Sequence, residues 1–219
     1  MSPLTEQYGH LVDFNKRSLL ISACAIAFNP TFWNIVARRE YRTKFITKAF
    51  GSAQAGCYAL AITIFSLGLL RDFLYERALR DQPSHPLLEG EVPTYAGYAL
   101  VALGNLFVIS STWQLGITGT FLGDYFGILM DDIVTGFPFN VTNAPMYYGS
   151  TMSFLGSALI YGKPAGILLT GVVLAVYLVA IQFENPFTAE IYAKRERERS
   201  KGGSKAKKAK GSKGGKKEL

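Results

Sequence analysis

The chain has 219 residues, with 23 lysine and arginine residues against 16 aspartate and glutamate residues, a net charge of +7. Lys194–Leu219 carries 12 of the basic and 3 of the acidic residues, a net +9, which leaves 11 basic and 13 acidic residues, a net −2, for residues 1–193. The basic segment lacks interleaved aromatic residues and follows an apolar body, which argues against a nucleic-acid partner. Two histidines are too few for a metal site, so no metal ligand is expected.

Long uncharged stretches dominate the first 193 residues. They are residues 18–37, 49–70, 92–123, 133–162 and 164–183. Because roughly 20 apolar residues cross the hydrocarbon core of a bilayer, these stretches predict an integral membrane protein and exclude a soluble enzyme. The predicted fold is all-α, a bundle of about four to five hydrophobic helices.

The first predicted helix is Leu19–Ala37, interrupted by Asn29-Pro30. Proline removes a helix hydrogen bond, so a kink or a shallow re-entrant shape is expected there. The basic segment Arg38–Lys48 follows, and then a second helix over Gly51–Leu70. Three prolines and several charges predict a polar loop over Arg71–Thr94.

The third predicted helix is Tyr95–Ile117, followed by a mixed aromatic segment over Gly119–Ala144. Two further helices are expected over Met146–Tyr161 and Ala165–Phe183. Only the turn signal Gly162-Lys163-Pro164 separates them, so they should form a hairpin.

Basic residues near the ends of spans set the orientation in the membrane. Arg38–Lys48 and the basic tail should therefore lie in the cytosol, and Arg71–Thr94 in the lumen. Both conditions hold only if Met146–Phe183 enters the membrane and returns. This arrangement places Asn143–Gly149 and Phe183–Pro186 at the same membrane face.

We expect three regions: an N-terminal segment (1–18), a membrane domain (19–193) and a Lys-rich cytosolic tail (194–219). The tail has no apolar surface to bury, which predicts disorder. Its last residues, Lys216-Lys217-Glu218-Leu219, resemble the dilysine retrieval signal of endoplasmic-reticulum membrane proteins. That resemblance implies coat machinery as a partner and a multi-pass protein of the endoplasmic reticulum with a cytosolic C-terminus.

Several long strings carry a family resemblance: NPTFWNIVARRE (29–40), GTFLGDYFGIL (119–129), FPFNVTNAPMYYGST (137–151), KPAGILLT (163–170) and ENPFTAEIY (184–192). They closely resemble the phosphatidylethanolamine N-methyltransferase family, in its small single-unit form and fungal branch. The resemblance implies methyl transfer from S-adenosyl-L-methionine to the amine of a phospholipid. Mono- and dimethylated phosphatidylethanolamine are the implied substrates, and phosphatidylcholine the implied product.

In this family cofactor binding is assigned to a Gly-x-Gly in the third span and to a Glu-Glu pair after the last. The matching positions are Ala102-Leu103-Gly104 and Glu184-Asn185, each with one departure from the pattern. Ala102 narrows a close approach to the cofactor, and Asn185 removes a charge but can still form hydrogen bonds. The alternative for Ala102–Gly104 is packing of small residues between membrane helices.

A P-x-Y-x-G element adds Pro145, Tyr147, Tyr148 and Gly149 as cofactor-binding candidates. The isoprenylcysteine carboxyl methyltransferases share this element, but an arginine-histidine pair precedes their proline. Here the pair is Asn143-Ala144, which argues against that branch.

Methyl transfer to an amine needs alignment of donor and acceptor and removal of a proton, but no covalent nucleophile. The candidate proton acceptors are Asp124, a carboxylate in an apolar stretch where it is costly unless paired or functional, and Glu190, which is alternatively a surface acid. Aromatic rings attract sulfonium and ammonium groups, although interfacial anchoring is their alternative role. The rings in question are Tyr125, Phe126, Phe137, Phe139, Tyr147 and Tyr148.

Two other functions stay open at this point. One is methylation of a different membrane substrate, such as an isoprenylcysteine carboxylate. The other is a non-catalytic membrane transporter, which would call for repeat symmetry and polar residues at mid-membrane depth. Neither feature is evident in the sequence.

Overall fold

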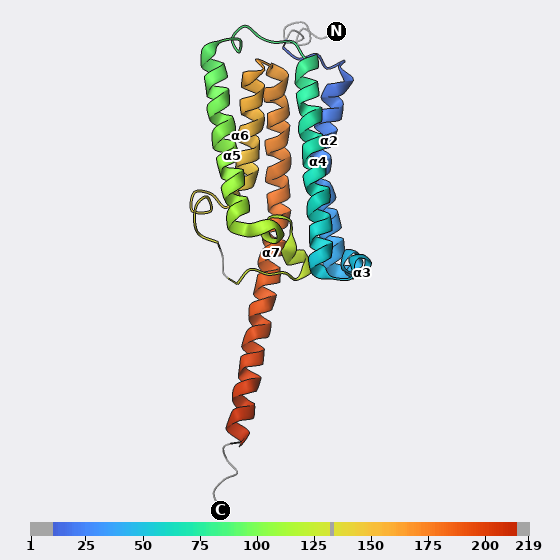
Figure 1. Cartoon of the computed structure of the whole chain (residues 1–219), viewed down its shortest axis with the longest axis vertical. Helices are drawn as coiled ribbons and strands as arrows, with labels where there is room; N and C mark the ends of the chain where they lie inside the picture. The colour runs from blue at the N-terminus through green and yellow to red at the C-terminus, as the bar shows by residue number, and fades with distance from the viewer. Residues whose placement is uncertain (1–10, 132–133, 214–219) are drawn as a thin grey trace, which may run out of the picture.

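A computed structural model describes residues 11–131 and 134–213 of the chain. Its elements are α2 (Arg17–Thr43), α3 (Phe45–Phe50), α4 (Ala53–Asp81), α5 (Glu91–Thr120), the 3-10 turn η1 (Gly123–Phe126), α6 (Pro145–Ile160) and α7 (Pro164–Lys213). The long helices α2, α4, α5, α6 and α7 stand side by side in one bundle (Figure 1). The predicted all-α bundle is confirmed.

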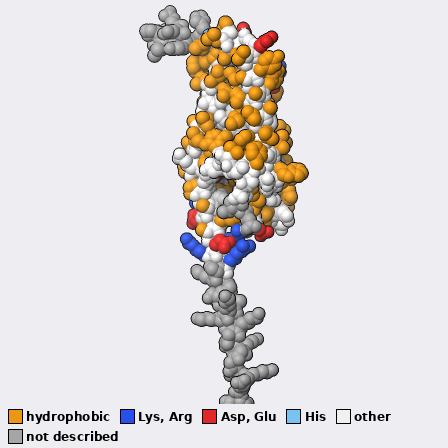
Figure 2. Space-filling view, turned by 90° about the vertical axis from the view of Figure 1, so that its left-hand side faces the viewer, with side chains coloured by type: hydrophobic (Ala, Val, Ile, Leu, Met, Phe, Trp, Pro, Cys, Tyr) orange, Lys and Arg blue, Asp and Glu red, His pale blue; other side chains and the backbone are white. Residues whose placement is uncertain are grey.

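The outside of the bundle is apolar. Figure 2 shows hydrophobic side chains over most of the visible body, with charges gathered where α7 leaves the bundle. Trp113, Ile62 and Ile109 are 87%, 67% and 65% exposed. Within the described ranges, four helices are long and apolar enough to cross a membrane: α2, α4, α5 with η1, and α7. An apolar exterior of this extent fits a bilayer and not water.

The first span, α2, is one continuous helix of 27 residues that contains Pro30. The side-chain amide of Asn29 donates a hydrogen bond to the Leu67 carbonyl on α4 (3.1 Å). This contact fastens α2 to its neighbour beside the proline. The chain thus continues through Pro30 as one helix, and a full crossing of the membrane by this helix stays a prediction.

The predicted loop over Arg71–Thr94 is wrong in its first half, because α4 continues as a helix to Asp81. Tyr75 and Leu79 are buried against the last two helices, and the Tyr75 hydroxyl donates to the Phe154 carbonyl (2.9 Å). The charged segment Arg71–Asp81 thus continues α4, because its residues have good helix propensity and one of its faces packs against the bundle.

The hairpin of α6 and α7 is confirmed. Its tip is tied to the loop that follows α4, since the His85 amide donates to the Gly162 carbonyl (3.1 Å) and the Lys163 ammonium to the Gln82 carbonyl (2.7 Å). Figure 1 shows these turns at one end of the bundle and α3, η1 and the start of α6 at the other. The basic segment after α2 and the exit of α7 therefore share one end, as predicted.

The last helix continues beyond the apolar body. In the structure α7 runs through Pro186 to Lys213, and the division at residue 193 into a membrane domain and a disordered tail stays a prediction. Lysine, alanine, arginine and glutamate have high helix propensity. Arg195 also fastens the segment by donating to the Met130 carbonyl (2.6 Å). The dilysine motif lies outside the described residues.

Glycines make α5 and α6 the most closely packed pair of helices. A Cβ on Gly104 would lie 2.4 Å from the Gly149 carbonyl oxygen, and a Cβ on Gly97 would lie 2.7 Å from the Gly156 carbonyl oxygen. Each pair is seven residues from the other along its helix, about two turns, so both lie on one face. Small residues of this kind let membrane helices approach closely.

This packing predicts that Gly156→Ala destabilises the protein by about 1–3 kcal/mol through overpacking, because the new Cβ would lie 2.5 Å from the Gly97 carbonyl oxygen. The matched control is Gly68→Ala on α4, where a Cβ would meet no atom within 4 Å. The midpoint of thermal unfolding in detergent micelles measures both. Equal midpoints for the two variants would contradict the packing argument.

Candidate functional site

The Glu184 carboxylate joins three helices near the basic end of the bundle. Oε1 accepts hydrogen bonds from Trp33 Nε1 (2.7 Å) and Asn34 Nδ2 (2.7 Å), both on α2. Oε2 accepts from the Tyr147 hydroxyl on α6 (2.5 Å). A carboxylate has about four acceptor positions, so this Glu184 clamp leaves about one free.

Local structure positions each member of the clamp. Pro145 is the first residue of α6, where its fixed φ favours a helix start, and so Tyr147 lies in the first turn. The Tyr147 ring packs edge-on against Tyr177 of α7 (4.8 Å between centroids). Asn34 also donates to the Pro30 carbonyl (3.0 Å), which holds its amide toward the α2 backbone. The clamp is thus built from rigid helices.

A second cluster of polar side chains surrounds the Tyr177 hydroxyl inside the bundle. Arg71 on α4 donates to the Tyr177 hydroxyl (2.5 Å) and pairs with Asp72 (2.8 Å). Ser150 lies 3.3 Å from the same hydroxyl, between oxygen atoms. The Arg71 side chain is only 12% exposed. A charge in a spanning helix needs such partners, because leaving it unpaired is costly.

Phe187 on α7 is the centre of an aromatic and basic group one helical turn below the clamp. Its ring stacks on Tyr125 of η1 (5.0 Å) and meets Tyr41 edge-on (5.2 Å). The Arg38 guanidinium lies over the same ring at 4.6 Å and donates to the Phe183 carbonyl (2.6 Å). Rings and a cation are therefore concentrated next to Glu184.

Of the two predicted proton acceptors, the structure brings Asp124 to this end of the site. Asp124 lies on η1, is half-buried and accepts a hydrogen bond from Thr188 (2.8 Å). Thr188 is one helical turn beyond Glu184 on α7. Glu190 is exposed, and no described residue forms a hydrogen bond or ion pair with it.

Two buried polar atoms near the clamp have no hydrogen-bond partner among the described residues. They are Asn34 Oδ1, beside Glu184, and the hydroxyl of the fully buried Tyr125. Buried polar groups are nearly always hydrogen-bonded, so each such atom calls for an explanation. A polar ligand bound at this end would supply the missing partners.

The cofactor-binding residues predicted in the third span do not lie near Glu184. Ala102 and Leu103 are exposed on the outside of α5, and Leu103 is 48% exposed. Gly104 is buried, and its place against Gly149 is explained by helix packing. The structure thus joins the two glycine elements to each other rather than to Glu184.

The remaining predicted residues lie around the start of α6 and the exit of α7. Pro145 is buried and Tyr148 half-buried, whereas Asn185 is exposed. Among the predicted rings, Phe126 packs with the Cys57 cluster and Phe137 against Phe107. These two rings therefore support the fold instead of facing the clamp.

Sequence reasoning missed Trp33, Asn34 and Arg38 as members of the site. All three fall in NPTFWNIVARRE, a string that carried part of the family resemblance. Asn34 and Arg38 are four residues apart and share one helix face, and Asn34 is a polar residue in an apolar run. That pattern could have indicated a polar helix face turned toward the inside of the bundle. It could not have indicated Glu184 as the partner of Asn34, because Glu184 is far away in the sequence.

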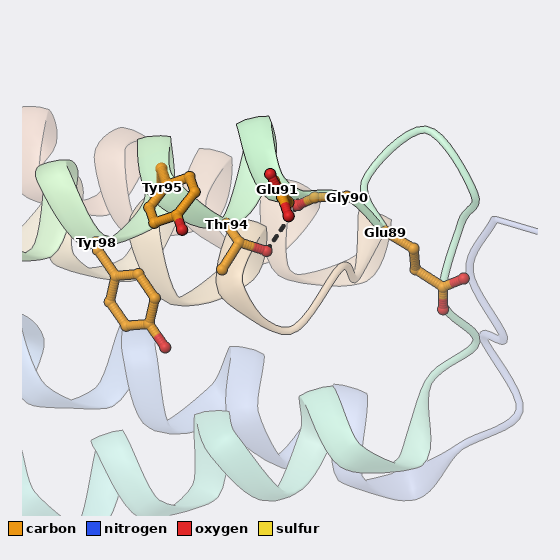
Figure 3. A pocket seen from close by; sticks show the side chains of 6 residues that line it. All are labelled: Glu89, Gly90, Glu91, Thr94, Tyr95 and Tyr98. Carbon is orange, nitrogen blue, oxygen red and sulfur yellow. Dashed lines mark hydrogen bonds between the residues drawn. The ribbon is translucent and has the colours of Figure 1, made fainter.

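A shallow groove of about 550 Å³ lies at the start of α5, at the other end of the bundle from Glu184 (Figures 1 and 3). It is lined by Glu89, Gly90, Glu91, Thr94, Tyr95 and Tyr98. The Thr94 hydroxyl donates to the Gly90 carbonyl (2.8 Å), a bond within the first turn. Exposed tyrosines at a helix end are typical of the membrane interface, so the groove carries no catalytic argument.

Comparison with known proteins shows to which family the chain belongs. The phospholipid methyltransferase family profile matches residues 92–195. A phosphatidyl-N-methylethanolamine N-methyltransferase from Neurospora crassa is 78% identical over 200 residues, which cover 91% of this chain and 94% of that protein. The chain belongs to the phospholipid methyltransferase family.

Other members of this family are also similar. A phosphatidyl-N-methylethanolamine N-methyltransferase from Saccharomyces cerevisiae is 55% identical over 194 residues (89% of this chain, 94% of that protein). A phosphatidylethanolamine N-methyltransferase from Rattus norvegicus is 48% identical over 184 residues (84% and 92%). No solved structure matches.

The family resemblance inferred from the sequence is thereby confirmed, and the chain is a methyltransferase enzyme. The transporter and carboxyl-methylating alternatives are not favoured. As the aligned regions cover most of this chain and of each relative, the resemblance concerns the whole bundle.

The clamp predicts that Tyr147→Phe and Glu184→Gln are coupled in their effect on stability. Tyr147→Phe removes the donor of the hydrogen bond to Oε2, and Glu184→Gln removes the charge and one of the two acceptor oxygens, so the double variant should lose less than the sum, with a coupling free energy of about 0.5–3 kcal/mol. Chemical unfolding in detergent micelles measures the cycle. Tyr148→Phe is the control, since no described carboxylate accepts from that hydroxyl, and should be additive with Glu184→Gln. Additivity in both cycles would contradict the clamp.

Proposed function

We propose that the chain transfers a methyl group from S-adenosyl-L-methionine to the amine of phosphatidylethanolamine-type lipids. The mono- and dimethylated lipids are the proposed main substrates, with phosphatidylcholine as the product. The strongest single support is the Glu184 clamp, an acidic and aromatic site at the basic end of an apolar bundle. The names of the fungal relatives, phosphatidyl-N-methylethanolamine N-methyltransferases, favour the methylated substrates.

The residues at the clamp fit S-adenosyl-L-methionine chemically. Glu184 has a free acceptor position for its amino group or ribose, and Asn34 Oδ1 and the Tyr125 hydroxyl lack partners that a polar ligand would supply. The Tyr147 ring, whose hydroxyl donates to Glu184, can attract a sulfonium cation, the more so away from water. When bound, the cofactor supplies an electrophilic methyl group.

The other residues implied by the family pattern complete this proposal. We assign Pro145, Tyr148 and Gly149 to the frame that holds Tyr147 in place at the start of α6. Ala102–Gly104 and Asn185 stay predictions of the resemblance, and the burial of Gly104 against Gly149 already has a packing explanation.

The protein's own part in the reaction is orientation and proton removal. A substrate ammonium must lose a proton before its nitrogen has a lone pair for attack. We assign the proton to an Asp124 oxygen, because Thr188 holds that carboxylate one turn from Glu184. Glu190, exposed further along α7, is the second candidate. Holding amine and methyl group in line supplies much of the acceleration.

The activity is tested with the full chain in microsomes, given labelled S-adenosyl-L-methionine and dimethylated phosphatidylethanolamine. Wild type should yield labelled phosphatidylcholine, and Glu184→Ala should yield none at equal protein level. Asp124→Asn should lower kcat by about 10²–10⁴-fold, the usual contribution of a general base. Glu190→Gln should retain activity. Loss of activity in Glu190→Gln with normal activity in Asp124→Asn would instead identify Glu190 as the proton acceptor.

Parallel assays with unmethylated, monomethylated and dimethylated phosphatidylethanolamine test the substrate class. The two methylated lipids should have the higher kcat/KM. A higher value for the unmethylated lipid would contradict this part of the proposal. Absence of labelled lipid from all three would contradict the activity itself.

We further propose a location in the endoplasmic-reticulum membrane with the C-terminus in the cytosol. Arg38–Lys48 and the start of the basic tail lie at one end of the bundle, which the positive-inside rule places in the cytosol. Coat machinery reading Lys216-Lys217 is the proposed partner for retrieval.

Glycosylation tests the orientation. The sequon at Asn140 lies in the segment that joins η1 to the start of α6, both at the basic end, and should stay unmodified in microsomes. The double variant Leu87→Asn, Glu89→Thr creates a sequon in the loop after α4, where Leu87 is 81% exposed, and should acquire a glycan. Glycan addition at Asn140 instead, read as a shift on a gel, would reverse the proposed topology.

A further inference from the structure

Arg38 is a cation without an acidic partner among the described residues. One terminal nitrogen donates to the Phe183 carbonyl (2.6 Å), and the guanidinium lies 4.6 Å from the Phe187 ring centre and 5.9 Å from that of Phe183. A guanidinium has five N–H donors. Most of them are therefore available, on a group whose position is already set by two rings and a carbonyl.

The place of Arg38 relates it directly to the proposed site. It lies one turn below Asn34 on α2, and Asn34 donates to Glu184. Its carbonyl partner, Phe183, directly precedes Glu184 on α7. The free donors of Arg38 thus lie about one helical turn from the clamp, on the side toward the basic end.

Arg38 is half-buried, with exposed side chains on both sides of it along α2. Ile35, one turn above it on α2, is 62% exposed, and Arg39 is exposed beside it. A second cation, Lys44, is held nearby by a hydrogen bond to the Tyr125 carbonyl (3.1 Å). Tyr125 stacks on the same Phe187 ring that Arg38 covers. An anion arriving from the lipid headgroup layer would meet both cations.

We propose that Arg38 binds the phosphodiester of the lipid substrate and so sets the position of the amine to be methylated. This inference rests on the proposed function. The planar guanidinium matches two phosphate oxygens in a way that an ammonium does not. In an ethanolamine headgroup two carbons separate the phosphate from the amine. A phosphate on Arg38 therefore leaves the amine within reach of the region between Glu184 and Asp124.

The methyl donor also carries an anion, its carboxylate, and the same guanidinium chemistry would bind it. The exposed outer surface at Ile35 and Arg39 favours the lipid, because a bilayer substrate reaches the protein from the side. The partnerless polar atoms on the inner side, Asn34 Oδ1 and the Tyr125 hydroxyl, are uncharged and suit the rest of the donor.

The test uses the full chain in detergent micelles and two direct binding measurements. Native mass spectrometry measures binding of monomethylated phosphatidylethanolamine without methyl donor, with diacylglycerol as a probe that lacks phosphate. Equilibrium dialysis measures binding of S-adenosyl-L-methionine. Arg38→Gln should weaken phospholipid binding and raise its KM by about 10- to 100-fold, as expected for loss of a charge-assisted hydrogen bond. Diacylglycerol and donor binding should change less than about threefold.

Two further variants control for charge and geometry. Arg38→Lys keeps the positive charge but loses the planar pair of N–H donors that matches two phosphate oxygens. Its phospholipid binding should therefore lie between that of Arg38→Gln and that of wild type. Arg39→Gln removes the same charge from the adjacent position, whose guanidinium lies over Phe45 (5.3 Å), and should leave both affinities unchanged. Equal weakening by Arg38→Gln and Arg39→Gln would reduce the effect to general surface charge and overturn the proposal.

The remaining outcomes also decide the matter. Weaker donor binding with unchanged phospholipid binding would assign Arg38 to the donor carboxylate and overturn the proposal. Equal loss for phospholipid, diacylglycerol and donor would mark a folding defect, and also overturn it. If wild type binds phospholipid in an Arg38-dependent way but methylates no lipid, the proposed function fails while the phosphate site stands.

Discussion

The constraint on which the architecture depends is the Glu184 carboxylate, which lies on α7 directly after the apolar part of that helix. A charge at this depth is tolerated only when protein donors replace the water that hydrated it. Those donors come from α2 and α6, so one side chain fixes the relative positions of three helices. The same requirement creates the site, because satisfying Glu184 gathers Trp33, Asn34 and Tyr147 at one point.

Other contacts complete the bundle by different physical means. In lipid the hydrophobic effect does not drive one helix against another, so close packing and polar bonds must do so. Glycine pairs hold α5 against α6. Buried Glu40 accepts from the Ile46 amide (2.6 Å) and the Thr47 hydroxyl (2.5 Å), which fastens the short basic helix α3 below α2. Lys44, between α2 and α3, donates separately to the Tyr125 carbonyl (3.1 Å).

This arrangement suits chemistry on a lipid headgroup. The proposed site lies at the basic end of the bundle, where the Arg38 guanidinium lies over the Phe187 ring and Asp124 accepts a hydrogen bond from Thr188, one turn beyond Glu184 on α7. Methyl transfer needs alignment, a proton acceptor and shielding from water, and rigid helices supply the first two without a covalent nucleophile. The positive net charge of the chain comes from the tail, at +9, whereas residues 1–193 carry a net −2.

The sequence by itself determined the membrane class, the helical bundle, the hairpin and the family, because apolar length and long matching strings are local properties of the chain. It also indicated Glu184 and Asp124. Only the tertiary structure decided what surrounds them. Glu184 and Trp33 are 151 residues apart, and no local pattern in the sequence shows which distant donor will form a hydrogen bond with a half-buried carboxylate. The extent of α4 and α7 was likewise a tertiary matter, since charged segments such as Arg71–Asp81 become helical where one face can pack.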